Sequence, residues 1–320
     1  MMRIVAFIIF IHTSLFSQTD TNFIQLQPYN GTIYSYLNNK NNAIEYFSKT
    51  ANYRLTYNPN SWGSFGIGAS YKWVDVSVGL YSFGKLDENK YGTTIRTDFQ
   101  FHLYPRKYII DLFLQNYKGF YSINKEVIQP NHKALIRSDI GMNHIGLNFI
   151  RIINDKHYST KAAYSLSEIQ KRKAGTWAFG AKFNVFNVYS DSTLLNPSID
   201  SLYQNDYKIK QFTSLLIGFL GGYLHNWLYK NWVFNITLMA GLANQLQYKE
   251  LSSQLNKFYP HSTTGIILNV RLGAGYNSKR SFFYIYGITD NCNYPLSDKY
   301  SIKHSFGRVD FCYGYRLFKN

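Results

Sequence analysis

Charged side chains recur at alternate positions along many segments of this 320-residue sequence, and the positions between them are apolar. Successive side chains of a β-strand point to opposite faces, so such charges would share one face of each strand. Inside a closed sheet they could set the ion preference of a water-filled path. Alternatively, Arg and Asp on neighbouring strands could pair and block it. The candidate charges are Asp75, Arg96, Asp98, Asp111, Arg137, Asp139, Lys161, Lys182, Arg271, Asp310 and Arg316.

The densest basic stretch is Lys171, Arg172 and Lys173, which precedes Gly175. Lys and Arg side chains bind phosphate and carboxylate groups, so this stretch could be an anion-binding loop. The alternative is a solvated strand connection in which Gly175 provides the turn.

Ser-His-acid hydrolysis is a further possibility, because it needs only a serine, a histidine and an orienting carboxylate within hydrogen-bond reach. The histidines beyond the amino-terminal segment are His102, His132, His144, His157, His225, His261 and His304. None of them lies in a recognisable catalytic motif, and no H-x-x-x-H or cysteine pair indicates a metal site. The sequence therefore names no catalytic, cofactor-binding or metal-binding residue.

The segments that would position these side chains share a period of two from about Gly31 to Leu317. Apolar and polar faces that alternate in this way are typical of barrels with lipid outside and a polar lumen. The longest later apolar run, Leu215 to Leu220, is too short for a spanning helix. In lipid, only helices and closed barrels satisfy the backbone. The sequence therefore predicts an all-β fold, a single antiparallel transmembrane β-barrel of about 12–14 strands.

Strands are expected near 31–38, 44–57, 64–72, 73–83, 93–104, 107–120, 136–153, 157–169, 176–189, 209–226, 231–247, 262–276, 281–290 and 302–318. Short periplasmic turns and long outer loops alternate in outer-membrane barrels. The predicted alternation fails between 157 and 209, where the connections 170–176 and 190–208 would both have to face outside. Either a short strand is missing from the prediction there, or one of these two connections faces the periplasm.

The amino terminus has the layout of a secretory signal. Arg3 precedes the apolar run Ile4 to Ile11, and small residues up to Ser17 follow it. We expect cleavage after Ser17, which leaves residues 18–320 as one barrel domain in the outer membrane of a Gram-negative bacterium.

A basic surplus remains after the signal, with 33 basic and 18 acidic residues, or +15 once Arg3 is removed from the +16 of the whole chain. Secretion argues against nucleic acid as a partner, and no nucleic-acid-binding module is recognisable. Anionic lipid head groups or phosphorylated glycolipid fit the charge and the compartment.

Three stretches together resemble an uncharacterised secreted bacterial family, domain of unknown function 4421. They are residues 61–73, residues 101–121 with the core Tyr104-Pro105-Arg106, and residues 162–176. The resemblance covers essentially the whole mature chain and implies an outer-membrane barrel, with no activity to transfer. One departure is the carboxyl terminus, where Phe318 falls on the polar parity and is followed by Lys319 and Asn320.

The function expected from these features is a structural barrel or narrow channel that contacts anionic glycolipid, with the barrel-insertion machinery as a partner. The alternative is a membrane-embedded lipid hydrolase or acyl-transfer enzyme.

The signal and the period of two predict that the protein fractionates with the outer membrane and migrates differently on gels before and after heating. Cell fractionation with gel-shift analysis checks this. Recovery as a soluble periplasmic monomer without detergent would contradict the barrel.

Overall fold

The computed structural model describes residues 19–49, 52–71, 74–124, 134–194, 209–251 and 261–319, so the predicted signal peptide lies outside the described residues. Its elements are β1 (Ile24–Leu26), β2 (Tyr29–Ser48), β3 (Tyr53–Tyr57), β4 (Gly63–Tyr71), β5 (Val74–Phe83), α2 (Glu88–Tyr91), β6 (Ile95–Leu103), β7 (Tyr108–Ser122), β8 (Leu135–Ile152), α3 (Thr160–Tyr164), β9 (Glu168–Gln170), β10 (Ala174–Tyr189), β11 (Ile209–Tyr229), β12 (Trp232–Leu251), β13 (His261–Asn277), β14 (Ser281–Pro295) and β15 (Tyr300–Lys319). None of the helices in these ranges is long and apolar enough to cross a membrane.

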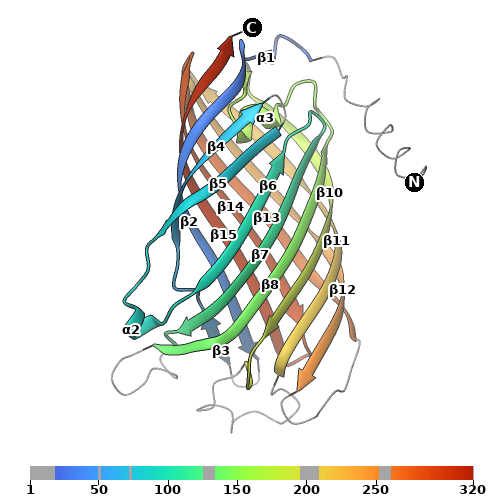
Figure 1. The fold of residues 1–320 in the computed structure, drawn as a ribbon. Helices are drawn as coiled ribbons and strands as arrows, with labels where there is room; N and C mark the ends of the chain where they lie inside the picture. The colour runs from blue at the N-terminus through green and yellow to red at the C-terminus, as the bar shows by residue number, and fades with distance from the viewer. Residues whose placement is uncertain are drawn as a thin grey trace, which may run out of the picture.

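A single antiparallel sheet forms a barrel (Figure 1). In the described part of the chain its wall contains twelve strands in the order β2, β4, β5, β6, β7, β8, β10, β11, β12, β13, β14 and β15. The last strand pairs with the first from Tyr300 with Ser48 to Lys319 with Tyr29, which closes the sheet. The predicted fold class is confirmed, at the lower limit of the predicted strand number.

The two faces of the wall differ as the period of two predicts. On β15, Phe311 and Tyr313 are 45% and 59% exposed, whereas Asp310 and Arg316 are 7% and 2% exposed. On β10, Trp177 is exposed and points outward. Large apolar side chains cover the outer surface on strands all around the barrel, which is the surface that a bilayer requires.

The connections differ in length between the two ends of the barrel. The turns 104–107, 230–231 and 278–280 lie at the end that holds the carboxyl terminus. The longer connection 84–94, which contains α2, lies at the other end, where β7 ends and β8 begins (Figure 1). In outer-membrane barrels the short turns face the periplasm. We therefore call the first end the periplasmic end and the second the outer end, and the protein is an outer-membrane barrel, as predicted.

Two parts of the predicted strand list are wrong. Residues 157–169 form no barrel strand but belong to a long connection that contains α3 and β9 and folds back at the periplasmic end (Figure 1). This connection explains the failure of the predicted alternation. In place of the predicted strands 31–38 and 44–57, the structure has one long strand, β2 (Tyr29–Ser48), and the short β3 (Tyr53–Tyr57).

The prediction that Phe318 faces the lumen is also wrong. Its φ is +55°, so the regular alternation of β15 ends there. The ring is 71% exposed and lies against the outer side of Gly31. The last strand therefore ends with an aromatic side chain on the outer surface.

Phe311 lies near the middle of β15 on the outer surface, so Phe311→Arg should lower the free energy of unfolding in lipid by about 2–4 kcal/mol. Phe311→Leu should cost less than about 1.5 kcal/mol. Denaturant titrations in vesicles measure both, and an arginine variant as stable as the leucine variant would show that the face is misassigned.

Candidate functional site

The wall of the barrel opens between β5 and β6. These strands pair only at Val74 with Leu103 and at Asp75 with His102. Beyond these two pairs they separate, and residues 76–82 of β5 are exposed on both faces. On its other side, β6 pairs with β7 along its whole length, from Ile95 with Lys118 to Leu103 with Ile110. We call the unpaired stretch between residues 76–83 and 95–101 the window.

The window ends toward the outer end because the strand after β2 is broken. Pro59, which cannot donate a backbone hydrogen bond, lies in the break between β3 and β4. Before the break, Asn58 exchanges two backbone hydrogen bonds of 2.8 and 2.9 Å with Tyr121 of β7. The chain just before β4 therefore pairs with β7 on the outer side of β4, β5 and β6. This contact bounds the window toward the outer end, and the pair Val74 with Leu103 bounds it at the other.

Asn60 attaches the β5–β6 connection to this break. Its amide oxygen accepts from the Leu86 backbone at 2.7 Å, and its amide nitrogen donates to the Gly92 carbonyl at 2.6 Å. Its backbone N–H donates to Thr94 Oγ1, which donates to the Gly119 carbonyl. Gly119 has a φ of +89°, which favours glycine, and β7 shifts register there. Hydrogen bonds that involve the side chains of Asn60 and Thr94 thus take the place of backbone ladder bonds in this region.

Arg96 of β6 reaches across the window. Its guanidinium donates to the Ser61 and Gly63 carbonyls at 3.1 and 3.0 Å and to Ser82 Oγ of β5 at 3.1 Å. All three acceptors are uncharged. Arg96 therefore bridges the two edges and brings a positive charge to the window, and no carboxylate of the described residues pairs with it.

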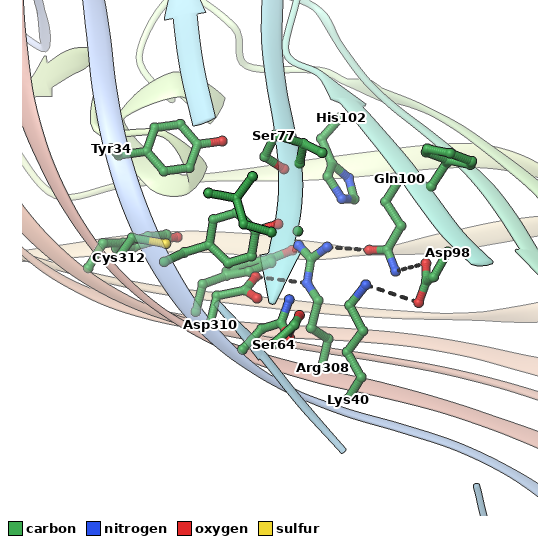
Figure 2. Close-up of a pocket in the computed structure, with 18 of the residues that line it drawn as sticks. Tyr34, Lys40, Ser64, Ser77, Asp98, Gln100, His102, Arg308, Asp310 and Cys312 are labelled. Atoms are coloured by element: carbon green, nitrogen blue, oxygen red, sulfur yellow. Dashed lines mark hydrogen bonds and ion pairs between the residues drawn. The ribbon is translucent and has the colours of Figure 1, made fainter. Parts of the chain in front are cut away.

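Behind the window lies a cavity of about 340 Å³, which we call the side pocket. Its rim is apolar on the outer surface, where Val76, Val78 and Leu80 of β5 and Ile95 and Phe99 of β6 are between 50% and 70% exposed. Its inner wall combines polar groups with aromatic rings, among them Phe282, Tyr284 and Tyr286. The polar residues of that wall include Tyr34, Tyr36, Lys40, Ser64, Ser77, Arg96, Asp98, Gln100, His102, Arg308, Asp310 and Cys312, and Gly79 lines it as well. Figure 2 shows Lys40, Asp98 and Arg308 among them.

A chain of polar contacts forms the floor of the side pocket. Lys40 of β2 contacts Asp98 at 2.9 Å, and Gln100 donates to the same carboxylate at 2.9 Å. Arg308 of β15 donates to Gln100 and contacts Asp310 at 2.7 Å (Figure 2). Strands that are not neighbours in the wall thus hold β6 from inside the barrel.

Deeper in the lumen the charges are paired and buried. Arg271 donates to Asp111 at 2.5 Å, and neither side chain is exposed. His102 Nδ1 lies 2.7 Å from the other oxygen of Asp111. Lys182 pairs with Asp290. These four charged groups carry little or no accessible surface, so they do not line a water-filled path.

Aromatic rings fill the lumen next to these pairs. Phe186 stacks on Tyr294 at 5.1 Å between ring centroids and on His304 at 4.7 Å. Phe113 packs against Phe306 at 5.5 Å, and all these rings are buried. Within the described residues, packed side chains therefore block the axis of the barrel. Of the two alternatives expected from the sequence, a water-filled path and a lumen blocked by paired charges, the structure therefore has the blocked lumen.

The connection 153–173, which contains α3 and which we call the mouth segment, fills the periplasmic mouth of the barrel. Ser159 caps this helix by accepting from the Ala162 N–H at 3.0 Å. The Ala163 carbonyl accepts from Asn235 of β12 at 2.7 Å, and Arg316 of β15 donates to the Leu166 carbonyl at 2.8 Å. Burial raises the pKa of the Tyr164 phenol in α3, so this group stays neutral near pH 7 and bonds Thr237.

The structure divides the predicted lumen charges into several groups. Arg96, Asp98 and Asp310 line the side pocket; Asp111, Lys182 and Arg271 form the buried pairs; Arg316 binds the mouth segment. Arg137 pairs with Asp139 at 2.8 Å, and Lys161 lies in α3 and pairs with Glu168 at 3.3 Å. The backbone of Asp75 pairs with His102, and its side chain lies outside what the structure describes.

The predicted basic loop is exposed at the periplasmic end. Lys171 Nζ donates to the Thr21 carbonyl at 3.0 Å, and the Arg172 guanidinium lies 5.6 Å from the Phe23 ring centroid. Lys173 is exposed as well. These contacts attach residues 171–173 to the segment around β1. They fit the alternative in which this stretch is a solvated strand connection.

The alternation did not identify Lys40, Asp290 and Arg308, which complete the ion pairs. Lys40 falls between the two strands predicted for β2, and Arg308 has the same parity as Asp310. Its parity was therefore a usable signal.

Three histidines inside the barrel form hydrogen bonds to carboxylate or amide oxygens. His102 contacts Asp111, His144 contacts Gln115, and His304 contacts Asn42. The Nε2 of His102 has no partner among the described residues. In the same residues, no group of three His, Cys, Asp or Glu side chains is placed to hold a metal ion.

The fold and the site define an outer-membrane β-barrel with a blocked lumen and a pocket in its wall. The chain belongs to the family described as "Domain of unknown function (DUF4421)", whose model matches residues 18–317, as the sequence resemblance predicts. A comparison with curated proteins finds no match.

Several solved outer-membrane proteins are similar in outline. The outer membrane protease OmpT from Escherichia coli is 9% identical with a TM-score of 0.41, and the match covers 95% of this chain and 100% of that one. The toluene transporter TodX of Pseudomonas putida is 8% identical with a TM-score of 0.29, and the match covers 91% of each chain.

The buried ion pair between Arg271 and Asp111 leads to a prediction about the stability of the barrel. Arg271→Met leaves Asp111 without its main countercharge and should lower the free energy of unfolding by about 3–5 kcal/mol. The double variant Arg271→Met/Asp111→Leu should regain much of that loss, because it removes both charges. Urea titration in lipid vesicles measures these changes, with exposed Lys171→Met as the control. A single variant no less stable than this control would contradict the pairing.

Proposed function

We propose that this barrel binds small amphipathic molecules that enter from the membrane through the window, rather than conducting solutes along its axis. One observation carries the proposal, namely that the side pocket opens between apolar rims on the outer surface while paired charges and rings fill the lumen behind it. A molecule dissolved in the bilayer would reach the pocket without crossing water.

The dimensions and the polarity of the side pocket fit such a ligand. Its volume of about 340 Å³ is at the small end of the range for small-molecule sites. The polar inner wall suits a head group, and the apolar rim at Val78 and Phe99 lets a hydrocarbon tail remain in the membrane. A polar group that leaves water is stabilised only where it finds hydrogen-bond partners, and the floor residues provide them.

The proposal replaces the narrow axial channel expected from the sequence with a lateral route. Contact with anionic glycolipid remains a proposal of its own. Arg54, Lys118 and Lys303 point outward near the outer end, where such head groups lie. Glu45 lies 3.5 Å from Arg54 and 3.6 Å from Lys303 and partly offsets their charge. Binding to the insertion machinery stays a prediction.

Gly79 offers a direct way to fill the side pocket. A Cβ at this position would approach Tyr36 and Ser64 no closer than 3.8 Å, so a larger side chain can enter the cavity without a backbone clash. Gly307 of β15 has the parity of the outer surface and open space around it, so Gly307→Trp adds the same side chain on the lipid side.

We expect photolabelling to distinguish these variants. A dodecanol that carries a diazirine, incorporated in lipid nanodiscs with the protein, should label inward-facing Tyr36 or Gln100 as well as outward-facing Leu242. Gly79→Trp should reduce the inward label about tenfold, as a loss of about 1.4 kcal/mol in binding would. Gly307→Trp should leave it unchanged. An inward label that is absent from the original protein, or equal in both variants, would overturn the proposal.

A further inference from the structure

We infer that the molecule held in the side pocket is a single-chain amphiphile with a carboxylate head, and that Arg96 recognises this head. The inference rests on the proposed function, because it names the class of ligand that the window admits. It starts from the distribution of charge along the window.

The cations that line the side pocket outnumber its carboxylates. Lys40 is paired with Asp98 and Arg308 with Asp310, at 2.9 and 2.7 Å. Arg96 is the third cation, and it donates to two carbonyls and one hydroxyl. The described residues therefore leave one positive charge of the pocket without a countercharge.

Arg96 also stands where a head group would stop. It follows Ile95, which is 70% exposed on the outer surface, and it lies two residues before Asp98 on the polar floor. A charge that is partly removed from water is costly unless an opposite charge accompanies it. A carboxylate that arrives with its chain still in the hydrocarbon would provide that charge.

The shape of the guanidinium favours a carboxylate. Its planar set of N–H donors matches the two oxygens of a carboxylate and binds them in parallel. A protonated amine would be repelled by Arg96, and an alcohol would offer only one acceptor atom. Single-chain carboxylates should therefore bind more strongly than alcohols or amines of the same length.

Arg96 has a second role that the experiment must separate, since it also ties β6 to β4 and β5. Ser82→Ala removes one of its three acceptors and changes no charge. Arg96→Lys keeps the charge with fewer donors, and Arg96→Gln removes the charge and keeps a polar side chain. If the charge of Arg96 determines ligand preference, only Arg96→Gln should change that preference. If the hydrogen bonds of Arg96 to its neighbouring strands determine it, Ser82→Ala should change it too.

The test compares diazirine derivatives of lauric acid, dodecanol and dodecylamine in nanodiscs, at a pH where the acid is ionised. Labelling of Tyr36 and Gln100 is read against labelling of Leu242. We expect the acid to label the inward positions about tenfold more than the alcohol, with the amine below both. Arg96→Gln should bring the acid to the level of the alcohol, whereas Arg96→Lys and Ser82→Ala should keep most of the difference.

The outcomes separate the two proposals. Equal inward labelling by acid and alcohol, lost in Gly79→Trp, would overturn the carboxylate inference and leave the lateral pocket standing. A preference for the acid that survives Arg96→Gln would overturn the role of Arg96. No inward labelling by any of the probes would overturn both proposals.

Discussion

A backbone N–H or C=O without a partner costs several kcal/mol in hydrocarbon, and this cost governs the architecture of the barrel. Ladder pairing continues around the wall and closes between β15 and β2. The pairing is interrupted at the window, where β5 and β6 separate after two pairs. A wall that is interrupted in this way needs other contacts to hold its edges, and those contacts shape the side pocket.

The inward side chains of β6 provide these contacts one after another. Arg96 bonds to the segment before β4 and to β5, and Asp98 binds Lys40 of β2. Gln100 binds Arg308 of β15, and His102 binds Asp111 of β7. The bonds of Arg96, Asp98 and Gln100 cross the window or the lumen, whereas His102 and Asp111 face each other on adjacent strands. β6 therefore keeps its place without a partner strand on one side. Deeper in the lumen, the Lys182–Asp290 pair and the rings around Phe186 block the axis.

The barrel itself could be predicted from the sequence because its signal is local. Alternation on β15 correctly assigned Phe311 and Asp310 to opposite faces. On β14 the inward positions Phe282, Tyr284 and Tyr286 are apolar and buried, so alternation cannot assign its faces, and the importance of Asp290 was missed. Apolar inward positions are expected wherever a lumen is packed rather than filled with water.

The window and the mouth segment depend on contacts that no local pattern encodes. The Lys40–Asp98 pair joins residues 58 positions apart, and the Arg271–Asp111 pair joins residues 160 apart. Residues 157–169 alternate well enough to resemble a strand, yet Ser159 caps a helix there and Ala163 binds the barrel wall. Pro59 is a local sign of the break between β3 and β4, but it cannot show which strands separate.

Hydrogen–deuterium exchange in lipid nanodiscs tests the unpaired window most directly. Amides of β5 that point toward β6 lack ladder partners and face a polar cavity, so residues 76–82 should exchange much faster than β14, which pairs on both sides. Peptide-level mass spectrometry resolves the two segments. Faster exchange of β5 is the result that this structure predicts, and equal protection of β5 and β14 would show that the wall is closed and would contradict the lateral route.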